Sequence, residues 1–317
     1  MINSYNLGKQ IIDCQKLINY RRVWVFVLRS LWHYRETKAL ENFFQSDSLY
    51  KEIIKKYPDI FLQLTRQVLY KNSTTAERCR NIIYHFSVLK TQLTNQAIQK
   101  IYLENGIQLW HEQLKEQSLS ANLFFSTSEI RDGMMTLIFR CNDSRVYHVN
   151  FWLAFNKENN LSLYIGALQG SRGALPIYKD LTKMFFGYRP KNIILYTLQL
   201  FAQCLSVKEI KAVSNYGFQA NNHFFRWNRK LKTSLDSFWI ESGGTLTEDK
   251  RFYSLPVHEK RKSMEEISSH KRNLYRKRFA ILDKIASGVV MTLTPLMRTV
   301  PEFSMKNIET VNSDTRK

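Results

Sequence analysis

The sequence predicts an α+β protein with an N-terminal helical layer, a mixed α/β sheet and a basic C-terminal helix. Apolar residues at helical spacing fill the first third of the chain, and three strand-like segments separated by turn residues follow. Near the C-terminus, a run of basic residues continues at helical spacing without acidic neighbours. With 317 residues, 44% of them hydrophobic, the chain can bury a sizeable core, which excludes a mainly disordered protein.

Residues 1–117 are expected to form the helical region. Thr74 and Glu77 have the spacing of a capping box, and apolar residues at helical spacing follow them. Pro58 is suited to open an earlier helix, and a later helix is expected to end near Gly106.

Residues 118–260 are expected to hold the sheet. Strands are predicted over 134–140, 146–155 and 161–168, because these segments are rich in β-branched and aromatic residues. The turns between them contain Asn and Asp, which favour tight reversals. This pattern is typical of an antiparallel meander.

A crossover is predicted after the meander. Helices are expected over 175–186 and 193–205, followed by a short apolar strand at 210–213. A last pair of strands is expected at 238–240 and 251–255, joined by a glycine-containing turn.

Residues 261–317 are expected to form a basic helix, predicted over 264–285, and a loosely attached tail from Val289 to Lys317. Five positive charges fall within eight residues of this helix. They suit an anionic membrane surface or a nucleic-acid backbone, with a plain solvated helix as the alternative. The predicted basic surface comprises Lys271, Arg272, Tyr275, Arg276, Lys277 and Arg278.

Charge dominates the composition, with 47 Lys and Arg against 27 Asp and Glu and a formal net charge of +20. We therefore expect the partner to be an anionic ligand, an anionic membrane surface or a nucleic acid. No window holds the roughly 18 apolar residues of a membrane span, and the apolar run at 23–28, flanked by arginines, is too short for a signal peptide. We expect a cytoplasmic protein, with a peripheral position at the inner membrane as a further option.

The sequence predicts no metal site. Its four cysteines are widely scattered and have no histidine clustered near them.

Two glycine-containing turns are candidate anion sites. Free amides at a helix N-terminus favour an anion, and two cations beside that positive end are unfavourable unless an anion docks there. A plain strand-to-helix turn and a solvated basic cap are the alternatives, and neither turn has the spacing of a Walker loop. The candidate residues are Gln169, Gly170 and Arg172 in the first turn and Gly187, Arg189 and Lys191 in the second.

No complete catalytic set is present, since the sequence has no GxSxG or HExxH motif and its seven histidines are dispersed. His223 and Asn215 are weak catalytic candidates, because they follow the strand at 210–213 and the groove of a mixed sheet often lies at strand ends. The order of elements resembles that of the GNAT acyltransferases, which would make acyl-CoA the cofactor. The usual pyrophosphate signature of those enzymes is absent from both turns, so the cofactor is left open.

Six segments together resemble the VirK/YbjX family of enterobacterial proteins, over about residues 45 to 285. They are LYIGALQG (163–170), LTK (181–183), GYRPK (187–191), AVSN (212–215), YSLP (253–256) and KRNLYR (271–276).

The resemblance implies a role at the cell envelope. Members of the family are associated with virulence, with surface display of an outer-membrane virulence protein and with resistance to cationic antimicrobial peptides. The family has no assigned activity, so no catalytic residue can be carried over. Besides an accessory protein that binds an anion or a lipid, an envelope-modifying acyltransferase and an RNA-binding post-transcriptional regulator stay open.

Overall fold

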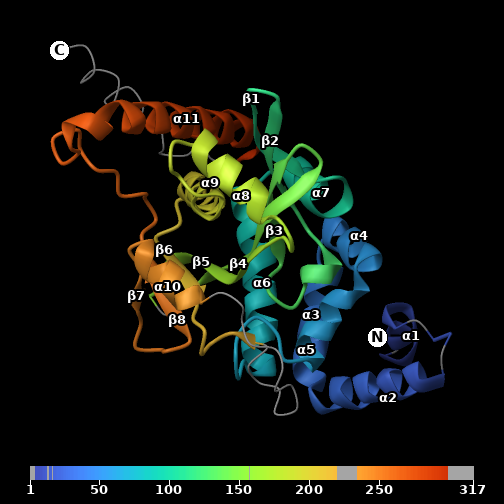
Figure 1. Cartoon of the computed structure of the whole chain (residues 1–317). Helices are drawn as coiled ribbons and strands as arrows, with labels where there is room; N and C mark the ends of the chain where they lie inside the picture. Colours follow the sequence, from blue (N-terminus) through green and yellow to red (C-terminus); the bar gives the residue numbers. More distant parts are fainter. Residues whose placement is uncertain (1–3, 13, 16, 157, 220–233, 299–317) are drawn as a thin grey trace.

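The structure is a computed structural model that describes residues 4–12, 14–15, 17–156, 158–219 and 234–298 (Figure 1). The N-terminal helical layer consists of α1 (Ser4–Ile11), α2 (Leu17–Trp32), α3 (Tyr34–Gln45), α4 (Ser48–Lys56), the 3-10 turn η1 (Pro58–Phe61), α5 (Leu62–Thr65), α6 (Thr75–Gln92) and α7 (Asn95–Leu103).

The local signals in this layer act as predicted. Thr74 caps α6, since its hydroxyl accepts from the backbone N–H of Glu77 at 3.1 Å and the Glu77 carboxylate accepts from the Thr74 N–H at 2.7 Å. Pro58 opens η1, which runs directly into α5. After α7 the chain turns at Gly106, whose φ of +89° suits glycine.

Eight strands form one mixed sheet in the order β1-β2-β3-β4-β5-β6-β8-β7. The predicted meander is confirmed by β3, β4 and β5, and two unpredicted strands, β1 and β2, extend it. Because β1 lies within residues 1–117, that range is not helical throughout. The strands are β1 (Ile107–Leu114), β2 (Gln117–Phe124), β3 (Met135–Cys141), β4 (Ser144–Phe155), β5 (Leu161–Gly170), β6 (Glu209–Val213), β7 (Thr245–Leu246) and β8 (Phe252–Leu255).

The predicted crossover is also confirmed. Helices α8 (Leu175–Met184) and α9 (Pro190–Cys204) carry the chain from β5 to β6, which pair in parallel. Helix α9 packs on the sheet, with the rings of Phe201 and Phe151 5.7 Å apart. The Trp110 indole donates to the Thr197 hydroxyl at 3.0 Å, which fixes α9 against β1.

The expected strand at 238–240 is wrong, because these residues belong to helix α10 (Leu235–Glu241). The hydroxyl of Ser234 caps this helix by accepting from the Ser237 N–H at 3.3 Å. The Trp239 indole donates to the carbonyl of Val213 at 3.0 Å, so this aromatic side chain is buried in the core although it lies on a helix and not on a strand. The last strand pair is β7 with β8 instead.

The basic C-terminal helix is present as α11 (Ser269–Leu293), followed by the 3-10 turn η4 (Thr294–Leu296). It begins later than predicted and extends further. The expectation of a loose tail from Val289 is wrong as far as residue 298, because Val289, Val290 and Leu293 are buried. The rest of the predicted tail lies outside the described residues.

The segment that follows α11 and η4 contacts the N-terminal helical layer. Met297 forms an isolated antiparallel bridge with Leu93, between α6 and α7. The Arg298 guanidinium donates to the Leu93 carbonyl at 2.9 Å and to the Asn95 side chain at 3.0 Å.

Of the helices in the described part of the chain, one is long and apolar enough to cross a membrane by length and composition, at Ser269–Leu296. Leu282, Ile285 and Val289 of this helix are buried in the core, whereas Met291 is exposed. The core helix of a globular fold passes the same length and composition test, and 39% of the apolar window of this helix is buried.

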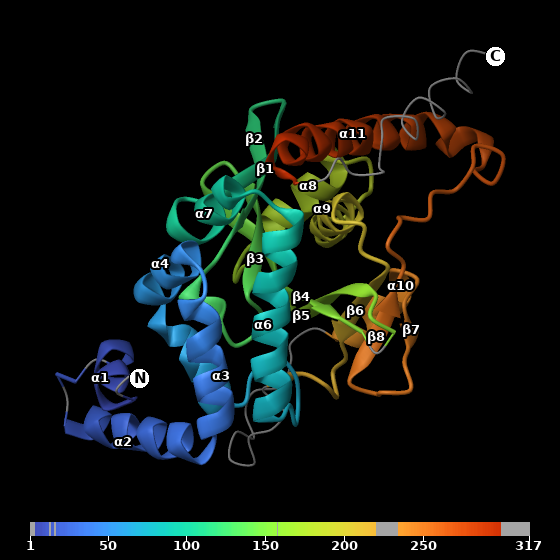
Figure 2. The same cartoon turned by 180° about the vertical axis from the view of Figure 1, so that it is seen from behind.

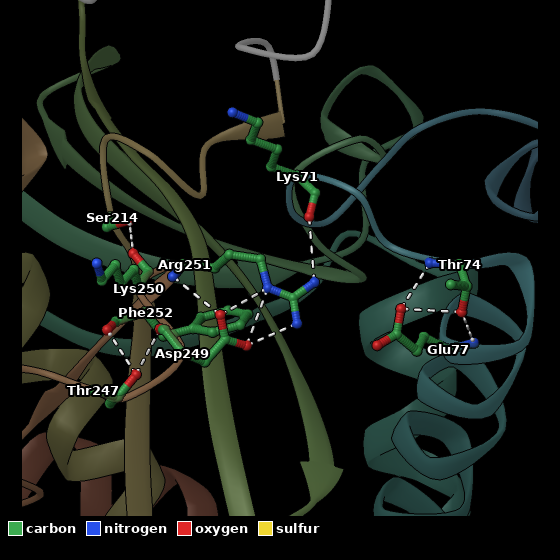
Figure 3. A network of polar contacts seen from close by, with 9 residues as sticks. All are labelled: Lys71, Thr74, Glu77, Ser214, Thr247, Asp249, Lys250, Arg251 and Phe252. Carbon is green, nitrogen blue, oxygen red and sulfur yellow. Dashed lines mark hydrogen bonds and ion pairs between the residues drawn. The ribbon is translucent and has the colours of Figure 1, made fainter.

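The helical layer and the far edge of the sheet are tied together by Arg251, at the start of β8 (Figure 3). The Arg251 guanidinium forms an ion pair with the Asp249 carboxylate at 2.7 Å. Its Nη1 also donates to the carbonyl of Lys71, a residue in the loop before α6, at 3.4 Å. Within the assembled fold, α2 and α11 lie at opposite ends of the molecule, as both views show (Figures 1 and 2).

Candidate anion-binding site

The first predicted turn joins β5 to α8. Gln169 and Gly170 end the strand, Arg172 stands in the turn, and all three are exposed. In the register of the sheet Gln169 lies opposite His148 of β4. Helix α8 lies between this turn and the second one along the chain.

In the second predicted turn, a carboxylate of the protein itself lies beside the two cations. Arg189 and Lys191 both pair with the carboxylate of Glu241, at the end of α10, at 2.8 and 3.4 Å. The Lys191 ammonium also lies 4.4 Å from the Phe238 ring centroid. The sequence could not place Glu241 here, because it lies 50 residues from Lys191 along the chain.

The second turn and the basic helix α11 meet. The Arg278 guanidinium donates twice to the carbonyl of Phe186, at 2.6 and 3.0 Å, just beyond the end of α8. Gly187 has a φ of +83°, and a Cβ at that position would lie 2.9 Å from Arg278 Nη2. The predicted basic surface is therefore partly structural.

The other members of that predicted surface differ in their roles. Arg272 donates to the Ile267 carbonyl at 3.1 Å, and the Tyr275 ring centroid lies 4.2 Å from the Arg278 guanidinium carbon. Lys271, Arg276 and Lys277 are exposed to solvent.

Asn215 organises the loop after β6. Its side-chain oxygen accepts from the Leu235 N–H at 2.9 Å and its side-chain nitrogen donates to Ser234 at 3.0 Å, which holds the start of α10. His223, the other weak catalytic candidate, lies outside the described residues.

A pocket of about 550 Å³ in the helical layer gathers five arginines that the sequence analysis did not single out. Three come from α2, one follows α5, and one precedes β3. The lining residues are Ile18, Arg21, Arg22, Val25, Phe26, Arg29, Leu62, Thr65, Arg66 and Arg131.

The backbone of the pocket is fixed by hydrogen bonds. The Arg29 guanidinium donates to the Thr65 carbonyl at 2.8 Å, which ties α2 to the end of α5. The Leu69 N–H donates to the Arg131 carbonyl at 2.7 Å, which holds Arg131 beside the segment after α5. Arginines from three separate segments thus line one pocket.

The arginines of this pocket have no ion-pair partner within the part of the chain that the structure describes. Burial, and then the charges of Arg131 and Arg22, lower the pKa of Arg66. The carboxyl of Asp59 acts on Arg66 in the opposite sense, but burial raises the pKa of Asp59 itself.

The chemistry of the pocket suits an oxyanion. A guanidinium presents several N–H donors in a planar fork that matches phosphate or carboxylate oxygens, and it stays charged at any physiological pH. In the described part of the chain, no three His, Cys, Asp or Glu side chains are grouped so as to hold a metal ion.

A family model described as "Protein of unknown function (DUF535)" matches residues 15–290. The chain belongs to the DUF535 family. The match confirms the resemblance to VirK/YbjX proteins, and it contains α2 and all five arginines of the pocket.

The DUF535 chain is similar to three curated relatives. "Uncharacterized protein YbjX" of Escherichia coli (strain K12) is 28% identical over 271 residues, which cover 82% of this chain and 80% of the relative. Two proteins of Haemophilus influenzae, each described as "Uncharacterized protein", are 28% identical over 227 residues (69% of this chain, 72% of the relative) and 24% identical over 274 residues (84% and 87%).

Proposed function

We propose that this DUF535 protein is an accessory protein of the bacterial cell envelope that binds a phosphate-bearing anion in the arginine pocket. The observation that carries the proposal is the gathering of five arginines around one pocket without a pairing carboxylate among the described residues. An array of like charges costs stability when it is empty, and a bound anion offsets that cost.

The envelope part of the proposal rests on the resemblance to the VirK/YbjX family, whose members are linked to outer-membrane virulence proteins and to resistance against cationic peptides. Phosphate-bearing groups are abundant at that location, as lipid headgroups and as soluble phosphates. The net charge of +20 supports the same class of ligand.

Thermal unfolding with pyrophosphate tests the pocket. At about 100 times its dissociation constant, a ligand of the folded state adds roughly 2.7 kcal/mol to the free energy of unfolding, which raises Tm by a few degrees. We expect this increase in the native protein and its loss in the Arg22→Gln, Arg131→Gln double variant.

Arg276→Gln is the matched control, because Arg276 is an exposed arginine on α11, at the other end of the molecule. It should keep the full pyrophosphate response. An equal response in all three proteins, or a response reproduced by sodium chloride at the same ionic strength, would show that the pocket is not the binding site.

A further inference from the structure

Helix α2 exposes an apolar face to solvent. The exposed fractions are 86% for Trp32, 65% for Ile18, 64% for Leu28, 59% for Leu31 and 55% for Trp24. A surface helix normally turns polar residues outward, and a contiguous exposed patch of large apolar side chains marks a docking surface.

The contacts that hold α2 in the fold come mainly from its other face. That face supplies Val23, Phe26 and Val27, which are buried. Gly8 of α1 lets that face pack closely, since a Cβ there would lie 2.9 Å from the Val23 side chain. Apart from Trp24, whose ring centroid lies 5.4 Å from that of Tyr5 on α1, the exposed apolar residues are additional to these contacts.

The apolar face and the arginine pocket adjoin each other. Ile18, Val25 and Trp32 follow one another at intervals of seven residues, which places them on one side of the helix. Ile18 and Val25 line the pocket together with Arg21, Arg22 and Arg29 of the same helix. Helix α2 contains no acidic residue.

We infer that this face of α2 docks on an anionic phospholipid bilayer, with a lipid phosphate in the arginine pocket. The inference rests on the proposed function of the pocket and names the source of its anion. Charge complementarity favours this occupant, because arginines beside Trp, Leu and Ile on one helix face are the composition of helices that lie in the membrane interface. The long axis of α2 would then lie in the plane of the bilayer.

Flotation with vesicles of phosphatidylcholine containing about one third phosphatidylglycerol tests the inference, with pure phosphatidylcholine vesicles for comparison. We expect the native protein to bind the anionic vesicles at physiological ionic strength and the neutral ones much more weakly. The Leu28→Ser, Trp32→Ser double variant should lose about tenfold or more in affinity for the anionic vesicles. Its response to pyrophosphate should match that of the native protein, since neither residue lines the pocket.

Met291→Ser is the matched control, because Met291 is an apolar residue, 75% exposed, on α11 at the far end of the molecule. It should bind the vesicles as the native protein does. Circular dichroism of each variant shows whether the fold is retained before binding is compared.

The possible failures are distinguishable. If Leu28→Ser, Trp32→Ser binds anionic vesicles with native affinity, the membrane inference is overturned while the pyrophosphate response still supports the pocket. If the native protein shows no pyrophosphate response, the proposed function fails, and vesicle binding that survives in Arg22→Gln, Arg131→Gln would show that the phosphate contact is absent.

Two other partners for this surface would also overturn the inference. A second copy of the chain would make the native protein a dimer in sedimentation and the Leu28→Ser, Trp32→Ser variant a monomer. RNA as the partner would give binding of an RNA oligonucleotide that depends on Arg22 and Arg131 and is unaffected by loss of the apolar residues.

Discussion

Five arginines that face one pocket are an arrangement in which individual residues oppose the stability of the fold. Arg66 is half-buried among positive neighbours, and Arg22 and Arg131 both lower its pKa. Such a cluster is expected where the arginines are retained for binding a ligand and not for the stability of the fold.

The first prediction follows from this repulsion. Without ligand, Arg22→Gln should raise Tm, because it removes one of the charges that act on Arg66. In concentrated salt the difference in Tm should vanish, since the Debye length, over which charges act on one another, falls to about 3 Å at 1 M ionic strength. Differential scanning calorimetry at low and high salt measures both effects, and a lower Tm for the variant in dilute buffer would contradict the repulsion.

A second residue-scale feature is a buried hydrogen-bonded chain through His85 on α6. Its Nδ1 accepts from the Leu153 N–H at 3.1 Å, so Nε2 carries the proton and donates to the Tyr102 hydroxyl at 2.7 Å. Tyr102 in turn donates to the Met134 carbonyl at 3.0 Å. These hydrogen bonds join α6 and α7 to β4 and to Met134, the residue before β3, without any charged group.

Replacing His85 by leucine should lower the free energy of unfolding by about 2–4 kcal/mol, because the Leu153 N–H and the Tyr102 hydroxyl lose buried partners. Tyr102→Phe removes only the hydroxyl and should cost less. Urea denaturation at neutral pH compares the three proteins, and a His85→Leu variant as stable as the native protein would contradict the role of the chain.

The same residue predicts a pH dependence. Burial lowers the pKa of His85 to about 3, whereas an unfolded histidine titrates near 6.5. Between these values the unfolded state binds a proton that the folded state does not, so this stabilisation is complete above about pH 6.5 and is lost as the pH falls, by up to about 1.4 kcal/mol per pH unit. The difference in pH slope between native protein and His85→Leu isolates this contribution, and identical slopes would refute it.

At the scale of elements, the contact between α8 and α11 converts part of a predicted basic surface into a structural joint. Arg278→Ala should lower the free energy of unfolding by about 1–2 kcal/mol, because the Phe186 carbonyl loses two charged donors. Lys277→Ala, at the exposed neighbouring position, should change it by less than about 0.5 kcal/mol. Urea midpoints distinguish the two, and equal midpoints would show that the joint contributes nothing.

The elements that the sequence predicted are those whose boundaries carry local signals. Asn142, with a φ of +52°, and Asn159, with a φ of +59°, mark the turns that separate β3, β4 and β5. By contrast, the apolar stretch Phe238-Trp239-Ile240 does not alternate with polar residues as a half-buried strand would. Ser234 caps the helix that contains it. A short apolar run is ambiguous between helix and strand until its flanking cap is considered.

At the scale of the whole molecule, the arginine pocket is a site that could not be predicted from the sequence. Its arginines come from α2 and from positions 66 and 131, and only the tertiary fold brings these segments together. One signal was available, namely the apolar run at 23–28 between Arg22 and Arg29, which fits no polar helix surface. The α+β class and the basic C-terminal helix were predictable because both depend on patterns within single segments.

The distance between α2 and α11 gives a further prediction. If α2 meets the bilayer, α11 at the opposite end lies in water, beyond the reach of the membrane surface potential. Neutralising the exposed cations by Lys271→Gln, Arg276→Gln and Lys277→Gln should therefore change the affinity for anionic vesicles by less than about twofold. Flotation measures this, and a large loss would mean that α11 faces the lipid.

The bridge between Leu93 and Met297 also affects the order in which the protein can fold during its synthesis. The junction of α6 and α7 emerges early from the ribosome, but the partners that cover it, Met297 and Arg298, emerge some 200 residues later. Until then the nascent chain has to hold an incomplete helical layer, whose buried surfaces are open to chaperones. The helical layer is therefore completed only after residues 297 and 298 have emerged, and a chain truncated before Met297 would lack the contacts that cover the junction of α6 and α7.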